Sequence, residues 1–179
     1  MALVDETMLN GQHQSSVGYQ ILDQYHSQPR KVKIACSGAG ASGLCLAFKI
    51  QRMLAPDTYD LAIYEKNTTV GGTWHENTYP GVACDIPAHI YSFTFDPKPD
   101  WSHYYAHGDE IQRYFEDFAD RHNTRKFIQF ETRVVGARWN TQEGIWKITL
   151  QNVVTGEERE DWAHFFINGS GRLVPRQNS

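Results

Sequence analysis

The feature that most constrains the fold is a glycine-rich turn between a short strand and an apolar helix. Apolar side chains alternate with Lys33 and Ala35 over residues 32–36, which predicts a strand. Residues 38–43 then read Gly-Ala-Gly-Ala-Ser-Gly, a G-x-G-x-x-G, and residues 44–54 continue as an apolar helical run. A strand, this turn and a helix in that order are typical of a dinucleotide-binding βαβ unit.

Each glycine of the turn has its own predicted role. Gly38 permits the tight turn off the strand, and Gly40 lets the backbone approach a pyrophosphate without a Cβ in the way. Gly43 lets the helix pack closely against the strand. The phosphates are then expected on the free N–H groups at the start of the helix, where the helix dipole favours negative charge.

A second strand and an acidic residue follow at the spacing that such a unit needs. Residues 59–64 form an apolar strand that ends at Glu65, 22 residues past Gly43. A carboxylate about 20 residues on from the glycines binds a ribose 2′-OH, so it favours NAD or FAD over a 2′-phosphorylated nucleotide. The alternative is a plain glycine-rich turn with a solvated glutamate at the end of a strand, which leaves the ordered series of motifs unexplained.

The composition limits the function classes. The 179 residues, 40% of them hydrophobic, are enough for one packed domain, and a net charge of −4 gives no sign of a nucleic-acid surface. The three cysteines have no CxxC spacing, so neither a disulfide framework nor a zinc site is indicated, and Cys36 and Cys45 are expected to be core thiols. No apolar run reaches the ~18 residues of a membrane span, and the start lacks the pattern of a signal peptide. We therefore expect a cytoplasmic protein.

The domain organisation is simple. Residues 1–30 are polar and aperiodic, so we expect a flexible amino-terminal extension, with a short docked turn near Tyr19 to Tyr25 as an option. Residues 31–179 are expected to form one domain. Within it, residues 66–101 form a long loop rich in turn signals and aromatic side chains, and loops of this length are usually functional.

The second half predicts one helix and then strands. Asp109 is a plausible N-cap, and apolar side chains at helical spacing carry this helix to about His122. From Phe127 the period changes to two, with turn signals at 141–144 and 155–156, which predicts three or four antiparallel strands. The apolar run 162–167 predicts a strand buried on both faces that lies beside the first strand.

These elements together predict an α/β fold of the Rossmann type. A parallel sheet is expected to carry helices on one face and an antiparallel β-meander on the other. His103 and His107 stand four residues apart, but nearby aromatic residues favour packing, and no acid completes a ligand set, so no metal site is expected.

The motifs in order also resemble those of a known family. The chain is similar, from about residue 31 to residue 175, to the amino-terminal FAD-binding part of flavin-dependent monooxygenases of the Baeyer–Villiger type, which turn ketones into esters or lactones. Its loop resembles those of fungal members that act on polyketide-derived ketones. The resemblance rests on the segments Gly38–Gly43, Glu65, Gly71–Trp74, Tyr79–Asp85, Tyr91–Ser92 and Asn168–Gly171.

The resemblance implies a role for each matching residue. The pyrophosphate of FAD would lie on the glycine turn, and Glu65 would hold the adenosine ribose. Val134 would contact the adenine through its backbone. The residues implied at the cofactor are Gly38, Gly40, Ala41, Ser42, Gly43, Glu65, Gly72, Thr73, Trp74, Ala83, Cys84, Asp85, Ile86, Tyr91 and Val134.

Simple chemistry agrees with several of these assignments. Gly71 and Gly72 permit close backbone approach, and Trp74 and Tyr91 offer flat faces for a ring system. Asp85 is open to two interpretations, a hydrogen-bond partner in the active site or an Asx residue that stabilises a turn.

The chain also departs from the family. A second G-x-G-x-x-G for NADPH, the F-x-G-x-x-x-H-x-x-x-W-P fingerprint and the segment that holds the ribityl chain are absent from the sequence. The family's catalytic arginine would lie beyond Ser179, so no catalytic residue is assigned. The leading hypothesis is a monooxygenase that uses FAD, NADPH and O₂ on a small-molecule ketone, in secondary metabolism. The alternatives are a truncated FAD-binding remnant or scaffold, and a small non-redox enzyme that reuses the pocket.

Overall fold

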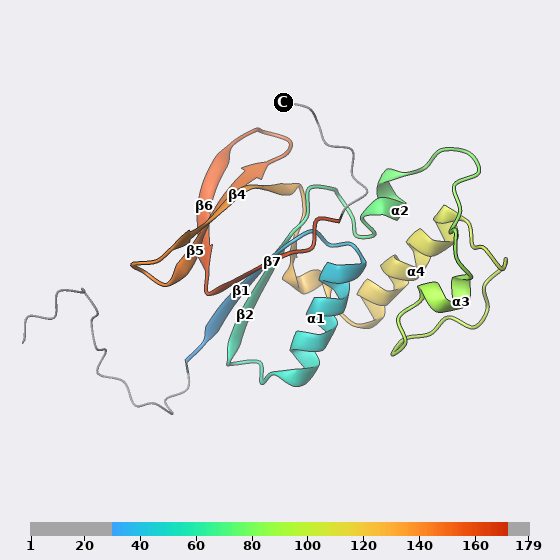
Figure 1. Cartoon of the computed structure of the whole chain (residues 1–179), viewed down its shortest axis with the longest axis horizontal. Coiled ribbons are helices and arrows are strands. Elements are labelled where there is room, and N and C mark those ends of the chain that lie inside the picture. The colour runs from blue at the N-terminus through green and yellow to red at the C-terminus, as the bar shows by residue number, and fades with distance from the viewer. Residues whose placement is uncertain (1–29, 172–179) are drawn as a thin grey trace, which may run out of the picture.

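The computed structural model describes residues 30–171, and a four-stranded parallel sheet organises them (Figure 1). The strand order is β3-β2-β1-β7. Strand β1 (Val32–Ser37) pairs with β2 (Tyr59–Tyr64) on one side and with β7 (Phe165–Asn168) on the other, and β3 (Ile128–Gln129) continues the sheet beside β2. Residues 1–29 of the expected extension (1–30) and the end of the resemblance near residue 175 lie outside the described residues.

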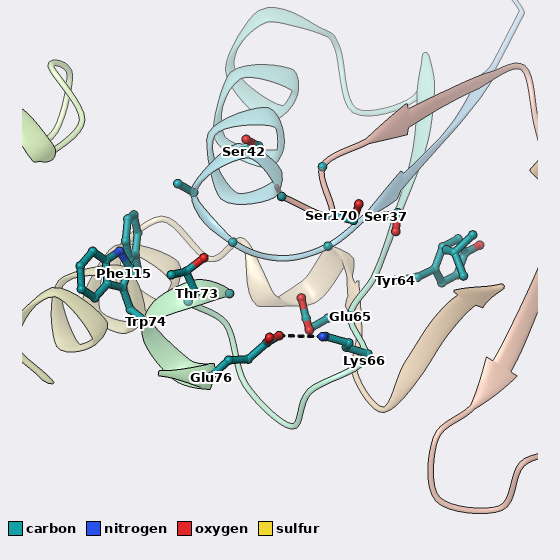
Figure 2. Close-up of a pocket in the computed structure, with 18 of the residues that line it drawn as sticks. Ser37, Ser42, Tyr64, Glu65, Lys66, Thr73, Trp74, Glu76, Phe115 and Ser170 are labelled. Carbon is teal, nitrogen blue, oxygen red and sulfur yellow. Dashed lines mark ion pairs between the residues drawn. The ribbon is translucent and has the colours of Figure 1, made fainter. Parts of the chain in front are cut away.

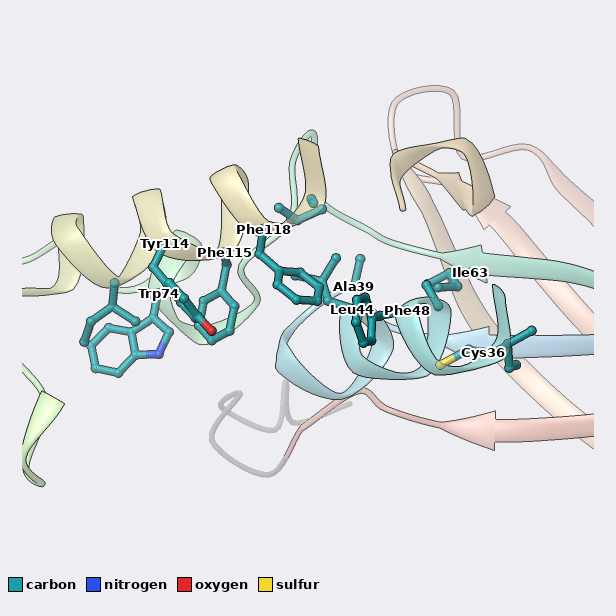
Figure 3. Close-up of a cluster of buried hydrophobic side chains, with 14 of the residues drawn as sticks. Cys36, Ala39, Leu44, Phe48, Ile63, Trp74, Tyr114, Phe115 and Phe118 are labelled. Carbon is teal, nitrogen blue, oxygen red and sulfur yellow. The ribbon is translucent and has the colours of Figure 1, made fainter. Parts of the chain in front are cut away.

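Helix α1 (Ala41–Met53) covers one face of this sheet, and its apolar face forms the main core together with that of a second long helix, α4 (Gly108–Arg121). Helix α1 follows β1 directly, and α4 packs beyond it (Figure 3). Phe48 of α1 contacts Phe118 of α4, with ring centroids 5.7 Å apart. The apolar spacing that predicted these helices is therefore the spacing that buries them.

The antiparallel meander lies on the other face. Its strands β4 (Thr132–Asn140), β5 (Ile145–Asn152) and β6 (Glu158–Ala163) pair in sequence order. A second core cluster joins Ile148 and Leu150 of β5 to Ala35 and Tyr64 of the parallel sheet. The predicted Rossmann-like fold, with helices on one face and a meander on the other, is confirmed.

The long loop after β2 contains two short helices. Helix α2 (Thr73–Glu76) follows the glycine pair, α3 (Ala88–Tyr91) comes later, and a 3-10 turn, η1 (Arg125–Phe127), follows α4. Phe93 and Phe95 of the loop stack on each other, at 5.0 Å between ring centroids, and pack against the main core. Much of the aromatic content of the loop therefore extends the core and does not face solvent.

Two predictions about strands are wrong. The alternating stretch from Phe127 does not open the meander, because Ile128 and Gln129 pair in parallel with Ile63 and Tyr64 of β2. The last apolar run is divided between β6 and β7, and β7 does lie beside β1 as predicted. Strand β7 is not buried on both faces as predicted, since Phe165 is 60% exposed at the edge of the described sheet.

The prediction for the start of the second long helix is also wrong in one detail. The N-cap is His107 and not Asp109, which lies one residue inside the helix and forms an ion pair with Arg113. The carboxylate of Asp109 stays in the first turn, where the helix dipole favours negative charge. The predicted end near His122 is confirmed, as are the turns at 141–144 and 155–156.

Candidate functional site

A cavity of about 420 Å³ opens where β1, β2 and β7 reach their carboxyl ends (Figure 2). This edge of a parallel sheet is where α/β folds bind ligands. Separate parts of the sequence line the cavity: the glycine turn, the end of β2 with the following loop and α2, the start of β4, and the chain after β7, together with the side chains of Tyr91 and Phe115. Its wall includes Ser37, Gly38, Gly40, Ala41, Ser42, Tyr64, Glu65, Lys66, Gly72, Thr73, Trp74, Glu76, Tyr91, Thr132, Arg133, Val134 and Ser170.

The glycine turn fits so closely that side chains would collide in it. Gly38 has φ +95°, and a Cβ there would lie 2.8 Å from the carbonyl oxygen of Gly169. A Cβ on Gly43 would lie 2.1 Å from the carbonyl oxygen of Gly38 and 3.6 Å from Ile63 of β2. The steric roles predicted for Gly38 and Gly43 are therefore confirmed.

A second glycine turn approaches the first. Gly72 has φ +55°, and a Cβ on it would lie 3.1 Å from Cα of Gly40. The N–H of Gly71 donates to the carbonyl of Ala39 at 3.2 Å. The glycine pair Gly71–Gly72, which was expected to permit close backbone approach, thus brings α2 against the wall formed by the first turn.

The start of α1 presents unpaired backbone donors at this wall. The first helical hydrogen bond runs from Leu44 N to the carbonyl of Gly40 at 3.0 Å, so the N–H groups of residues 41–43 precede any intrahelical acceptor. Gly40 is the N-cap and has no side chain to take their place, while Ala41 and Ser42 are exposed. Such a terminus is suited to bind an anion.

Glu65 stands at the far end of the same wall and is almost wholly buried. Its carboxylate accepts hydrogen bonds from the N–H of Ala39 at 2.6 Å and from the N–H of Asn67 at 2.9 Å. The acid predicted from spacing alone therefore also fixes the glycine turn to the end of β2. The backbone N–H of Thr132 donates to the carbonyl of Glu65 at 2.9 Å, which places the start of β4 beside it.

Two further charged residues, Lys66 and Glu76, line the cavity. Lys66 and Glu76 form an ion pair of 2.9 Å, drawn in Figure 2, and Asn67 donates to the same carboxylate at 2.9 Å. Burial alone would raise the pKa of Glu76, but the hydrogen bonds from Asn67 and Lys66 outweigh it and hold the pKa below its usual value. This ion pair connects α2 to the end of β2.

The opposite end of the cavity is aromatic. Trp74 of α2 is buried, and its indole N–H donates to the hydroxyl of Tyr91 at 2.9 Å. The two rings meet edge to face, with centroids 5.5 Å apart. Burial raises the pKa of Tyr91 above its ordinary value of 10, so it further favours the protonated hydroxyl. Thr73 and Phe115 complete this wall (Figure 2).

Five expected cofactor residues, Gly43, Ala83, Cys84, Asp85 and Ile86, are not among those that line the cavity. Cys84 is buried in the main core, and its N–H donates to the carbonyl of Ala106 at 2.9 Å. Ala83, Asp85 and Ile86 are exposed. Among the described residues no hydrogen bond supports Asp85 as an Asx residue or as an active-site partner, so both interpretations stay predictions.

The structure also brings together a polar network that no motif signalled. Asp161 of β6 accepts from the hydroxyl of Tyr64 and from the ammonium group of Lys33. Burial alone would raise the pKa of Asp161, but these hydrogen bonds hold it below its usual value of 3.8. Tyr64 lines the cavity, so this network joins the meander to its wall. No sequence signal marks it, because Asp161 belongs to the polar stretch 157–161.

The remaining predicted features are simple to place. His103 and His107 are in edge contact, with ring centroids 4.7 Å apart, and no three metal-ligating side chains gather within residues 30–171. Cys36 is buried, which raises the pKa of its thiol to about 11, while Cys45 is only partly covered. None of the helices in the same range is long and apolar enough to cross a membrane.

Known proteins share this architecture. Residues 38–107 match the NAD(P)-binding Rossmann-like domain. The chain is 45% identical over 145 residues to the FAD-binding monooxygenase tazF of Aspergillus terreus, and 35% identical over 127 residues to a Baeyer–Villiger monooxygenase of Streptomyces coelicolor. A crystal structure of OTEMO in complex with FAD and NADP is similar with a TM-score of 0.70 at 30% identity.

The matched regions are a small part of those proteins. The chain spans about a quarter of the length of the curated relatives it matches, 26% of tazF and 24% of the Streptomyces coelicolor protein, while 81% and 70% of this chain are covered. In the OTEMO complex, 83% of this chain corresponds to 27% of that chain.

Proposed function

Because the chain is related to FAD-dependent monooxygenases of the Baeyer–Villiger type, we propose that residues 31–179 form an FAD-binding domain whose cofactor occupies the cavity at the glycine turns. The observation that carries the proposal is the meeting of two glycine turns at the open start of α1. A Cβ on Gly72 would lie 3.1 Å from Cα of Gly40, so backbone meets backbone where the two turns approach each other. Free N–H groups at the start of a helix, beside glycines that have no side chain, fit a pyrophosphate.

Different residues of the chain would bind different parts of FAD. The N–H groups of residues 41–43 take the pyrophosphate, and the carboxylate of Glu65 accepts from a ribose hydroxyl. Trp74 and Tyr91 form the apolar end, where a flat ring system would displace water. Ala83, Cys84, Asp85 and Ile86 would join the site from the same loop, on the strength of the resemblance.

The proposal extends to the reaction. When bound, FAD supplies the redox chemistry that accepts hydride and activates O₂, and the protein supplies position and exclusion of water. We propose NADPH as the hydride donor and a small-molecule ketone as the substrate, converted to an ester or lactone in secondary metabolism. The support is the 35% identity to a Baeyer–Villiger monooxygenase, the similarity to a crystal structure that contains FAD and NADP, and, for secondary metabolism, the resemblance of the loop to fungal members of the family. The three unpaired cysteines support a cytoplasmic setting.

The test is flavin binding by the purified 179-residue chain. We expect a yellow protein that retains FAD through gel filtration, with the fluorescence of Trp74 quenched by the bound flavin. The matched control is Gly72→Val, whose side chain would meet Gly40 and close the cradle, and this variant should elute colourless. A wild-type chain that is folded and holds no FAD would contradict the proposal.

The reaction needs a second measurement. Consumption of NADPH in air by the yellow protein, with an added cyclic ketone converted to a lactone, would support the monooxygenase. A yellow protein inert to NADPH would support the alternative of an FAD-binding remnant or scaffold. A colourless, folded protein that converts a metabolite would support the small non-redox enzyme.

A further inference from the structure

Arg133 is placed at the acidic end of the cavity by the start of β4. The N–H of Glu131 donates to the carbonyl of Asn67 at 3.1 Å, and the N–H of Thr132 donates to the carbonyl of Glu65 at 2.9 Å. These two bonds hold β4 alongside the end of β2. Arg133 is the next residue, and it lines the same cavity as Glu65.

The other charged groups of this cavity already have partners. Glu65 accepts two backbone hydrogen bonds, and Lys66 is paired with Glu76 at 2.9 Å. Within residues 30–171 the arginine side chains that donate to an acceptor are those of Arg113, Arg121, Arg125 and Arg159, and Arg133 is not among them. The cavity therefore contains one cation that its own walls do not engage.

Arg133 is half-buried and has no hydrogen-bonded partner within residues 30–171, and this combination distinguishes it from the other arginines of that range. Those without a hydrogen-bonded partner in the described part of the chain, such as Arg138, are exposed to water. Arg125, the other half-buried one, donates to Asp120 at 2.6 Å. Arg133 is half-buried as a residue, and none of its nitrogens is both buried and without a partner, so its guanidinium stays open to the cavity and to a ligand there.

The position favours a base over a phosphate. The backbone donors for a pyrophosphate are at the start of α1, and the carboxylate of Glu65 beside Arg133 disfavours a second phosphate. A guanidinium is planar, weakly hydrated and stacks on aromatic faces. We propose that Arg133 is a binding residue for the adenosine half of the dinucleotide, with its guanidinium stacked on the adenine ring. This inference rests on the proposed function, since it requires a dinucleotide in the cavity.

The test compares ligands with and without adenosine on the full chain. Wild type, Arg133→Ala, Arg133→Lys and the control Arg138→Ala are titrated with FAD and with FMN, and AMP is measured by displacement of FAD. Arg138 lies on the same strand, is exposed and lies outside the cavity. Urea unfolding of each variant establishes that the fold is intact.

The expected result is selective for adenosine. Arg133→Ala should bind FAD and AMP about tenfold more weakly, a change of about 1.4 kcal/mol, and should bind FMN as wild type does. Arg133→Lys should not restore FAD binding, because lysine keeps the charge and lacks the plane. Arg138→Ala should match wild type.

Three results would overturn the inference. These are unchanged FAD and AMP binding in Arg133→Ala, an equal loss for FMN, or full restoration by lysine, which would indicate a charge contact with phosphate. They differ from failure of the proposed function, which would be seen as a folded wild-type chain that binds no FAD.

Discussion

Replacement of Gly43 by alanine separates steric fit from backbone conformation. Gly43 has no positive φ, so alanine is allowed by its backbone and gains up to ~1 kcal/mol in helix propensity. Its Cβ, however, would lie 2.1 Å from the carbonyl oxygen of Gly38, where real Cβ atoms keep at least 3.0 Å. Helix α1 and the turn must therefore move apart by about 0.9 Å.

The magnitude follows from overpacking. A forced shift in a packed region costs ~1–3 kcal/mol, and a clash of Cβ with backbone belongs to the upper part of that range, so after the gain in propensity the net loss of stability should be about 1–2 kcal/mol. For a domain of this size that corresponds to a fall in Tm of ~2–8 °C. FAD affinity should fall as well, because the shift moves the N–H groups of residues 41–43 away from the turn.

The assay is urea unfolding of Gly43→Ala beside Gly136→Ala, each with and without FAD. A Cβ on Gly136 would lie 3.7 Å from Thr149, an ordinary contact, so this control should stay within ~0.5 kcal/mol of wild type. Equal stability and equal FAD affinity in the two variants would refute the reasoning, since the close approach at Gly43 would then cost nothing.

Other contacts give further tests. The hydrogen bonds that lower the pKa of Asp161 stabilise the fold above its ordinary value of 3.8, and this contribution is lost as the pH falls below it. Urea unfolding should therefore show Asp161→Asn about 1–3 kcal/mol less stable at pH 6, with the difference shrinking towards pH 3. Glu76→Gln breaks the pair with Lys66, which is partly exposed, so a double-mutant cycle on unfolding should give less than ~1 kcal/mol of coupling. Tyr91→Phe leaves the indole N–H of Trp74 without its acceptor and should cost ~1–3 kcal/mol in thermal unfolding.

The parts of the fold that local chemistry determines could be predicted. The strand 59–64 has the predicted bounds, and the turn at 141–144 is where glycine and polar residues indicated it. Ile128 was misassigned because alternation specifies a strand but not its neighbour, and tertiary context placed it beside β2. Phe165 was expected to be buried because an apolar run does not reveal whether its strand lies at an edge.

The residues of the candidate site also divide into those that the sequence predicts and those that only the folded structure brings together. Its glycines and Glu65 could be found because each is required by backbone geometry at a fixed spacing. Lys66, Glu76 and Arg133 could not, since charged residues in a sequence are usually solvated, and only folding places these three around one cavity. Asp85 lies in a motif, yet its neighbours in the structure do not give it a role.

Glu65 explains why the acid and the glycines belong to one unit. An ionised carboxylate has about four acceptor positions, and the N–H groups of Ala39 and Asn67 take two of them. The acid thus holds the glycine turn closed and keeps acceptor capacity for a ribose hydroxyl. A glutamine has one acceptor oxygen for the two N–H donors, and its amide group would face one of them. The requirement for a carboxylate at this position is therefore already present in the fold of the chain itself, before any dinucleotide enters the cavity.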